Sequence, residues 1–230
     1  MGTPKKVKTL AIDYGTSNCG IAFYTEDIKI VLPKATVKSD KLIEYLKSSE
    51  INEQDRIIFG LPISMSGRYS NQTFLTIDTA IKIKNIFGCK IFFVDERLTT
   101  STLYSQFKGK VNYKKVKKTK DQSSSVLILS SYIQNPKIGL ELIAKEIKEI
   151  SSDIKKYDNI LLYRISVDVN IHNVDIFTND PWTFWYYYKK GLKSTTLISD
   201  LKEHYDLLII SKENKDNLPK SITYCKSMCL

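Results

Sequence analysis

The chain has 230 residues, of which 42% are hydrophobic, and its formal net charge is +10. Such a chain can bury one substantial core, or one core plus a smaller addition. No apolar run approaches the roughly 18–20 residues of a membrane span, and the amino terminus lacks the apolar segment of a signal peptide. We therefore expect a cytoplasmic protein without membrane contact, and the basic excess favours an anionic partner such as nucleic acid.

The first informative segment is LAIDYGTSNCGIAFY, in which an apolar run leads Asp13 into a turn. Residues 10–12 predict a buried strand, Gly15 permits a tight reversal, and residues 20–24 predict the antiparallel partner. An ionised carboxylate beside a buried strand is costly unless a cation meets it, so Asp13 is a candidate for metal or phosphate chemistry. A simple turn cap is the alternative interpretation.

Strands and helices then alternate, which predicts an α/β fold with a mixed five-stranded sheet flanked by helices. Asp95 and Glu96 directly follow the last of these strands, and Asp121 opens the last helix. The further strands are expected at residues 29–32, 56–60 and 90–94, and the helices at residues 40–49, 71–87 and 121–134.

The remaining sequence predicts a smaller C-terminal α/β extension. Pro136 interrupts the chain, and the expected divisions are a domain at residues 1–135, a connecting helix within 136–152, and the extension at 153–230. We expect the aromatic run at 181–190 to pack against the first domain rather than to stack on bases. Within the extension, strands are expected at 159–167, 174–178 and 207–211, and a helix at 195–204.

Three carboxylates, on Asp13, Glu96 and Asp121, are each expected at the end of a strand or helix. Such a set can hold one or two Mg²⁺ ions, with Mn²⁺ as a substitute, and can thereby activate water for phosphodiester hydrolysis. The alternative for Asp121 is an ordinary helix N-cap.

Residues 108–120 contain seven lysines and no acid. Such a run is either a solvated loop or a contact to a phosphate backbone. Cys225 and Cys229 are the only closely spaced cysteines, and we expect an ordinary tail there rather than a zinc site, since His172 and His204 are distant in the sequence.

Four segments, IDYGTSNCGIAF, IIFGLPISMSGRYSNQ, VDERLTTST and DQSSSVLILSSYI, resemble in order and spacing the YqgF family of RNase H-like proteins, which is related to the RuvC Holliday-junction resolvases. The resemblance covers about residues 8–135. It implies an RNase H-like fold and Mg²⁺-dependent phosphodiester cleavage. The activity expected for the family is processing of the 5′ end of 16S ribosomal RNA precursors, and junction resolution is an older proposal.

By this resemblance Asp13, Glu96 and Asp121 would be the catalytic and metal-binding acids, with Asp95 as an alternative to Glu96. Residues expected to contact nucleic acid are Arg68, Arg97, Lys114, Lys115, Lys117 and Lys118. The expected partners are structured RNA, DNA junctions or a ribosome precursor, and the oligomeric state stays open. A rival interpretation is a catalytically silent protein that binds nucleic acid or the ribosome.

Overall fold

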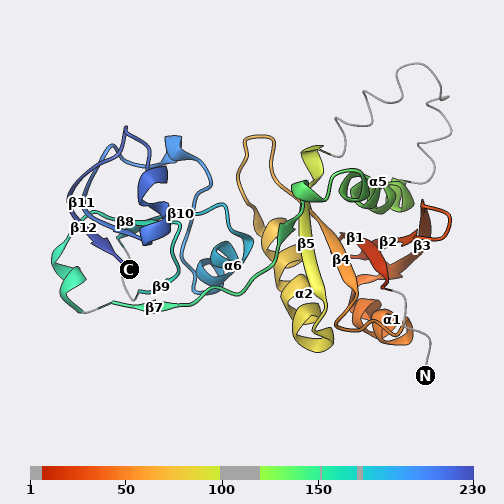
Figure 1. Cartoon of the computed structure of the whole chain (residues 1–230). Helices are drawn as coiled ribbons and strands as arrows, with labels where there is room; N and C mark the ends of the chain where they lie inside the picture. Colours follow the sequence, from red (N-terminus) through yellow and green to blue (C-terminus); the bar gives the residue numbers. More distant parts are fainter. Residues whose placement is uncertain (1–6, 99–119, 151, 170–172) are drawn as a thin grey trace, which may run out of the picture. The chain divides into compact units, whose positions relative to one another are not determined.

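The computed structural model describes residues 7–98, 120–150, 152–169 and 173–230, which form two compact units (Figure 1). The first unit consists of Met1–Ile63 and Ser70–Leu142, and the second of Ser64–Tyr69 and Ile143–Leu230. A short loop from the first third of the chain thus belongs to the second unit. No helix among the described residues is both long and apolar enough to cross a bilayer.

The first unit is built on a six-stranded mixed sheet with the order β3-β2-β1-β4-β5-β6. β1, β4 and β5 are parallel, whereas β2, β3 and β6 each run antiparallel to a neighbour. The carboxyl ends of the three parallel strands therefore meet at one edge of the sheet. The strands are β1 Thr9–Tyr14, β2 Asn18–Thr25, β3 Ile30–Lys38, β4 Arg56–Leu61, β5 Lys90–Asp95 and β6 Leu140–Glu141.

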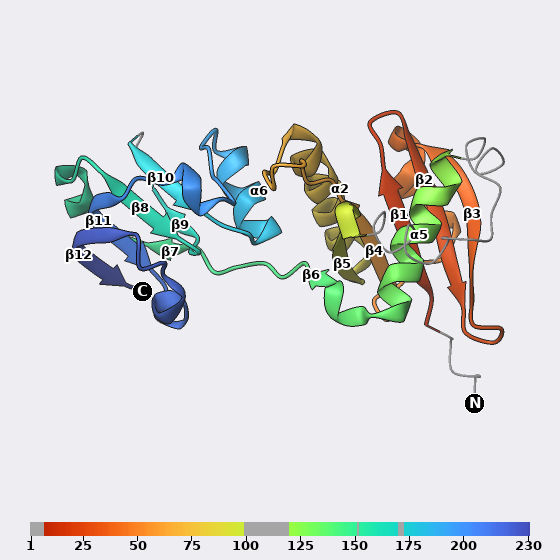
Figure 2. The ribbon, with the colours of Figure 1, turned by 90° about the horizontal axis from the view of Figure 1, so that it is seen from above.

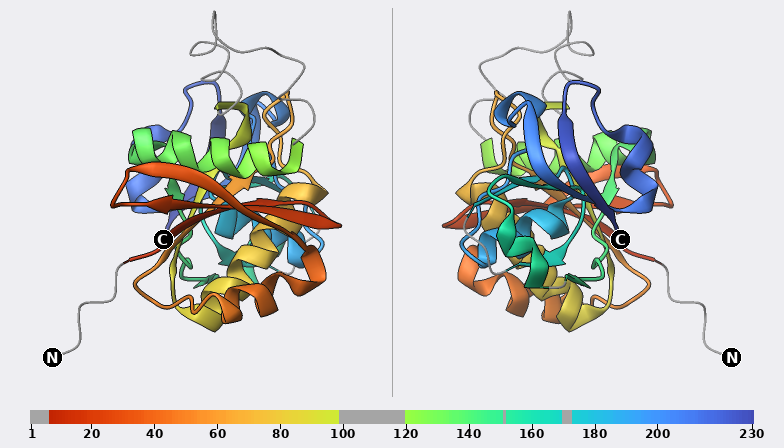
Figure 3. Two further views of the ribbon diagram at one scale, coloured as in Figure 1. Left: turned by 90° about the vertical axis from the view of Figure 1, so that its right-hand side faces the viewer. Right: turned by 90° about the vertical axis from the view of Figure 1, so that its left-hand side faces the viewer.

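Helices cover both faces of this sheet (Figure 3). Helix α5 (Lys120–Gln134) lies on one face, across β1, β2 and β3 (Figure 2). Helices α1 (Leu42–Ser48), preceded by the 3-10 turn η1 (Ser39–Lys41), and α2 (Asn71–Phe87) lie on the other. On the α5 face, Ala11, Ala22, Ile58 and Val94 are buried against Ile128 and Leu129. This arrangement confirms the mixed α/β sheet flanked by helices that the sequence predicts. The sheet has six strands rather than the expected five, because β6 is added beside β5.

The expected connecting helix within residues 136–152 is wrong. The chain forms the 3-10 turn η2 (Pro136–Ile138) and then β6, whose Leu140 and Glu141 pair with β5. The Leu142 amide also donates to the Ile91 carbonyl at 2.9 Å. Pairing satisfies backbone groups along the edge of β5 that would otherwise need water, and this outweighs the weak helical pattern of the segment.

The second unit contains a four-stranded, entirely parallel sheet with the order β10-β8-β11-β12. A separate parallel pair is formed by β7 and β9. The strands are β7 Lys148–Glu149, β8 Ile160–Tyr163, β9 Val167–Asp168, β10 Val174–Phe177, β11 His204–Ile210 and β12 Thr223–Cys229. The helical elements are η3 Ser152–Lys156, α6 Pro181–Lys189, η4 Ile198–Asp200 and η5 Lys212–Asn217.

The aromatic run at 181–190 forms helix α6. Asp180 caps it by accepting a hydrogen bond from the Thr183 amide, and Pro181 occupies its first turn. Tyr187 is fully buried, and its hydroxyl donates to the Ile165 carbonyl and accepts from the Val167 amide. Tyr186 and Tyr187 are therefore part of the buried core of the second unit.

The expected helix at 195–204 is also wrong. Thr195 lies extended against β10, because its amide donates to the Ile176 carbonyl at 2.8 Å and its carbonyl accepts from Thr178 at 3.0 Å. Only the short turn η4 follows before β11 begins at His204. The chain thus extends the edge of the parallel sheet, a long-range pairing that local helical spacing does not predict.

Candidate active site

Asp13 lies near the end of β1, after the fully buried Ile12. Ala11, two residues earlier on the same strand, packs against α5. Because side chains alternate along a strand, Asp13 lies on that same face of the sheet. The carboxylate is therefore at the edge where the parallel strands end, on the side covered by α5.

The turn that follows Asp13 is fixed from several sides. The Gly15 amide donates to the Asn18 carbonyl at 3.1 Å, and the Ser39 hydroxyl donates to the Gly15 carbonyl at 2.6 Å. From α2, the Gln72 side chain donates to the Tyr14 carbonyl at 3.0 Å. A Cβ at position 15 would lie 2.6 Å from the Asn18 carbonyl oxygen, so the tight turn requires glycine. These contacts fix the backbone of the turn that follows Asp13.

Glu96 follows β5 directly and reaches back over β4. A Cβ built on Gly60 would lie 2.6 Å from both the Glu96 Oε1 atom and the Ile128 Cδ1 atom of α5. The Glu96 carboxyl group is thus enclosed between the backbone of β4 and an apolar side chain. Sequence reasoning missed Gly60, although a glycine inside a buried strand often marks a close approach of another group.

The pKa of Glu96 is raised from 4.5 to about 7, first by burial and then by the negative charges of Asp13 and Asp95. The Asp13 carboxylate is therefore near enough to oppose ionisation of Glu96. Two acids placed together in this way form a site at which a bound cation is favourable.

The neighbouring acid Asp95 has a different environment. Arg97 engages it through a fork, with Nε 3.0 Å from Oδ1 and Nη2 2.7 Å from Oδ2, and the Arg97 amide also donates to Oδ1. Asp95 thus orients Arg97, whereas the Glu96 carboxyl group is the one whose pKa is raised by burial and then by the charge of Asp13.

Asp121 is the second residue of α5, and its side chain lies outside the described part of the chain. The direction of α5 is nevertheless clear from its contacts. Ile128 lies at Gly60, near the end of β4, whereas Tyr132, one turn later, packs on Phe92, nearer the start of β5. Helix α5 therefore runs against the parallel strands, and its N-terminal end points toward the edge that carries Asp13 and Glu96.

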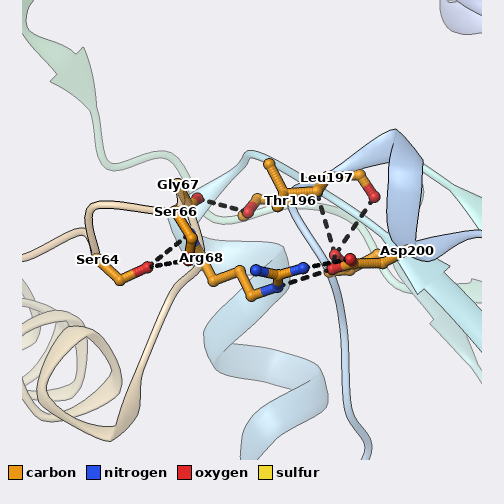
Figure 4. A network of polar contacts seen from close by, with 8 residues as sticks. Ser64, Ser66, Gly67, Arg68, Thr196, Leu197 and Asp200 are labelled. Atoms are coloured by element: carbon orange, nitrogen blue, oxygen red, sulfur yellow. Dashed lines mark hydrogen bonds and ion pairs between the residues drawn. The ribbon is translucent and has the colours of Figure 1, made fainter.

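Arg68, expected to contact substrate phosphates, is held within the second unit (Figure 4). Its Nε donates to Asp200 Oδ2 at 3.0 Å, its Nη2 contacts Oδ1, and Thr195 also donates to this carboxylate. The guanidinium lowers the pKa of Asp200, and the carboxylate raises the pKa of Arg68. The loop is fastened further by the Thr196 hydroxyl, which donates to the Gly67 carbonyl at 2.6 Å.

Tyr69 completes this attachment. Its ring meets that of Phe184 edge to face, with centroids 4.9 Å apart, and its hydroxyl donates to the Asn179 carbonyl.

The expected nucleic-acid contacts Lys114, Lys115, Lys117 and Lys118 lie outside the described residues.

The model of the RuvX family, described as Holliday junction resolvase, matches residues 7–135. A Thermotoga maritima protein named "Putative pre-16S rRNA nuclease" is 33% identical over 217 residues, which are 92% of this chain and 88% of that protein. A Mycoplasmopsis pulmonis protein of the same name is 30% identical over 57% of this chain and 95% of its own length. A Buchnera aphidicola protein of that name is 36% identical over 54% of this chain and 93% of its own length.

Among solved structures, YeaZ from Pseudomonas aeruginosa is similar to part of this chain, with 19% sequence identity and a TM-score of 0.26. The aligned part covers 38% of this chain and 44% of the YeaZ chain. The sequence relationships are more informative. The family model spans more than half of the chain, and it includes Asp13, Gly60, Glu96 and Asp121. The chain therefore belongs to the RuvX family.

Proposed function

We propose that this protein is a metal-dependent nuclease that hydrolyses phosphodiester bonds of structured nucleic acid, with the 5′ end of precursor 16S rRNA as its substrate. The observation that carries this proposal is the pair formed by Asp13 and Glu96. Burial, and then the negative charges of Asp13 and Asp95, raise the pKa of Glu96 to about 7. Residues with such shifts are common where ionisable groups perform chemistry.

The donor set fits a hard divalent cation, because Asp13 and Glu96 offer carboxylate oxygens at the edge where β1, β4 and β5 end. Asp121, at the N-terminal end of α5, is the proposed third ligand. We propose Mg²⁺ as the ion, with Mn²⁺ as a substitute. When bound, it would supply activation of water and stabilisation of the leaving oxygen.

The chain's own residues supply position and charge. Gly60 leaves the space that Glu96 occupies, and the turn at Gly15 fixes Asp13. Arg97, oriented by Asp95 and 39% exposed, is proposed to contact a phosphate of the substrate. Arg68 and the lysines at 114, 115, 117 and 118 are proposed as further backbone contacts, in keeping with the net charge of +10.

The choice of RNA is supported by the name that the Thermotoga maritima, Mycoplasmopsis pulmonis and Buchnera aphidicola relatives share. A ribosome precursor would accordingly be the partner, and the cytoplasm, where such precursors are processed, the location. A four-way DNA junction is the second candidate substrate, since the family model is described as Holliday junction resolvase.

The test is cleavage of a precursor 16S rRNA fragment and of a four-way DNA junction by the full chain, with Mg²⁺ or with EDTA. We expect metal-dependent cleavage of the RNA. Asp13→Asn should abolish it while leaving the melting temperature within a few degrees of the wild type, because the side chain stays nearly the same size but loses its charge.

Asp27→Asn, at an exposed acid outside the site, is the matched control and should cut normally. Equal cleavage by Asp13→Asn and the wild type would refute the assigned site. Binding of RNA without cleavage under any divalent metal would favour the catalytically silent binding protein, and cleavage of the junction alone would favour the resolvase.

A further inference from the structure

Strands β11 and β12 bring together three side chains that are far apart in the sequence. They pair in parallel, with His204 opposite Thr223 and Leu207 opposite Lys226. His204 and Asp206 are two residues apart on β11, and Cys225 is two residues after Thr223 on β12, so the three come together on adjoining strands. One ligand atom from each lies within 4.8 Å of the others.

The contacts of His204 suit the tautomer that a metal site needs. The Thr223 hydroxyl donates its hydrogen to the Glu203 carbonyl at 3.0 Å, and the same oxygen lies 2.8 Å from the Nδ1 atom of His204. With its hydrogen on Glu203, that hydroxyl can accept one from Nδ1. In this tautomer the lone pair of the ring is on Nε2, the atom close to Cys225. Metal-binding histidines characteristically donate their other ring hydrogen in this way.

The spacing of the two softer ligands also suits a metal. The Nε2 atom of His204 lies 3.3 Å from the Sγ atom of Cys225. A tetrahedral zinc ion would hold such atoms about 3.5 Å apart, given bonds of about 2.0 Å to nitrogen and 2.3 Å to sulfur. For this pair of atoms, a few tenths of an ångström of movement in the exposed thiol would be enough.

Asp206 supplies the third ligand from an anchored position. Its Oδ2 accepts hydrogen bonds from the Asn159 amide at 2.9 Å and from the Asn159 side chain at 3.4 Å. These bonds restrain the carboxylate, and an acid oxygen completes a nitrogen, sulfur and oxygen donor set. Thiolate and imidazole ligands select zinc over magnesium, which is the ion suited to the carboxylates of the first unit.

We propose that His204, Asp206 and Cys225 bind one Zn²⁺ ion, with a water molecule in the fourth position, and that this ion fastens β12 to β11. Binding displaces the Cys225 thiol proton to solvent and forms the sulfur–zinc bond. The backbone of β12 pairs with β11, but the side chains of residues 223–227 are all exposed, so a metal bond from Cys225 would add a side-chain attachment there. The site is independent of the nuclease assignment, since its residues all lie in the second unit.

The test is titration of the metal-free, reduced full chain with Zn²⁺, and with Co²⁺ as a spectroscopic probe. We expect one tight equivalent, a thiolate-to-cobalt absorption band and a raised melting temperature. Cys225→Ser should remove the band and weaken zinc binding at least tenfold. Thr223→Val, which keeps the strand but removes the hydrogen-bond acceptor, should weaken binding roughly 10- to 100-fold.

Cys229→Ser is the matched control, because it changes the other cysteine of β12 outside the cluster, and it should bind zinc normally. Asp13→Asn should also bind zinc normally, which separates this site from the one in the first unit. The proposal is overturned if the wild type takes up no stoichiometric zinc, or if Cys225→Ser binds it as tightly as the wild type does.

Discussion

At the scale of single residues, ionisation of Glu96 destabilises the folded chain, and a bound metal ion would relieve this destabilisation. Its carboxyl group is enclosed by the backbone of Gly60 and by Ile128, and the charges of Asp13 and Asp95 oppose its ionisation. In the folded chain its pKa is about 7, against 4.5 for an ordinary glutamate. Between these two values the folded state retains a proton that the unfolded state loses. Stability in the absence of metal therefore falls as the pH rises from about 4.5 to about 7.

We predict that Glu96→Gln stabilises the metal-free protein above pH 7. Glutamine copies the neutral carboxyl group, so the variant should match the wild type near pH 4.5 and exceed it at pH 8 by up to about 3 kcal/mol. Thermal unfolding in EDTA at both pH values measures this, with the exposed Glu26→Gln as control. Added Mg²⁺ should narrow the gap at pH 8, because only the wild type keeps the ligand. Equal melting temperatures at pH 8 in EDTA would contradict the assigned burial.

The acids of the site follow from local sequence features, but their surroundings do not. Asp13 and Glu96 are predictable because each follows an apolar strand, and parallel strands align their carboxyl ends. The role of Gly60 depends on a contact with Glu96, 36 positions later, and on Ile128 from another layer. No local pattern encodes that contact. The same holds for His204 and Cys225, whose separation in the sequence argues against a zinc site until β11 and β12 are seen to pair.

At the scale of elements, the loop at residues 64–69 is part of the segment IIFGLPISMSGRYSNQ, which resembles the family, and it belongs to the second unit. Arg68 is bound by Asp200, and Tyr69 packs on Phe184. A substrate phosphate would compete with the Asp200 carboxylate for the same guanidinium donors, since both anions accept bidentate bonds. Asp200 is therefore expected to lower the availability of Arg68 to nucleic acid.

We predict that Asp200→Asn tightens RNA binding a few-fold. The dependence of log affinity on log salt should steepen by about 0.7–0.9 if Arg68 then contacts one more phosphate. Filter binding or fluorescence anisotropy over a range of salt concentrations measures both quantities. Asp216→Asn makes the same change of charge at an exposed position of η5 and is the control. A gain that persists in the double variant Arg68→Ala/Asp200→Asn would show that Arg68 is not the cause.

Elements with their own amphipathic pattern were predictable, whereas those formed by edge pairing were not. Helices α2 and α5 and the strands β4 and β5 lie within a residue or so of their expected positions. The expected helices within 136–152 and at 195–204 are wrong, because Leu140 and Thr195 instead extend the edges of the two sheets. Backbone pairing with a distant strand overrides weak local propensity.

At the scale of the whole molecule, the first unit corresponds to a complete protein elsewhere in the family. The Mycoplasmopsis pulmonis and Buchnera aphidicola relatives are matched over 95% and 93% of their length by little more than half of this chain. The Thermotoga maritima relative is matched over 92% of this chain, so its alignment includes most of the second unit. The second unit has its own parallel sheet and its own buried core around Tyr187 and Leu207. It is therefore expected to modify the nuclease rather than to complete it.

We predict that a chain ending at Leu142 folds and retains metal-dependent cleavage of the same order as the full chain. The boundary keeps β6 and the Leu142 amide bond to Ile91, so the exposed edge of β5 stays paired. Losing Asp200 and Phe184 frees the loop at 64–69, which should raise its susceptibility to proteolysis at Arg68 and steepen the salt dependence of RNA binding. Thermal unfolding, cleavage rates and limited trypsin digestion measure these effects. A folded truncation without any cleavage would show that the second unit contributes directly to the active site, and a truncation that cannot fold would refute the independence of the first unit.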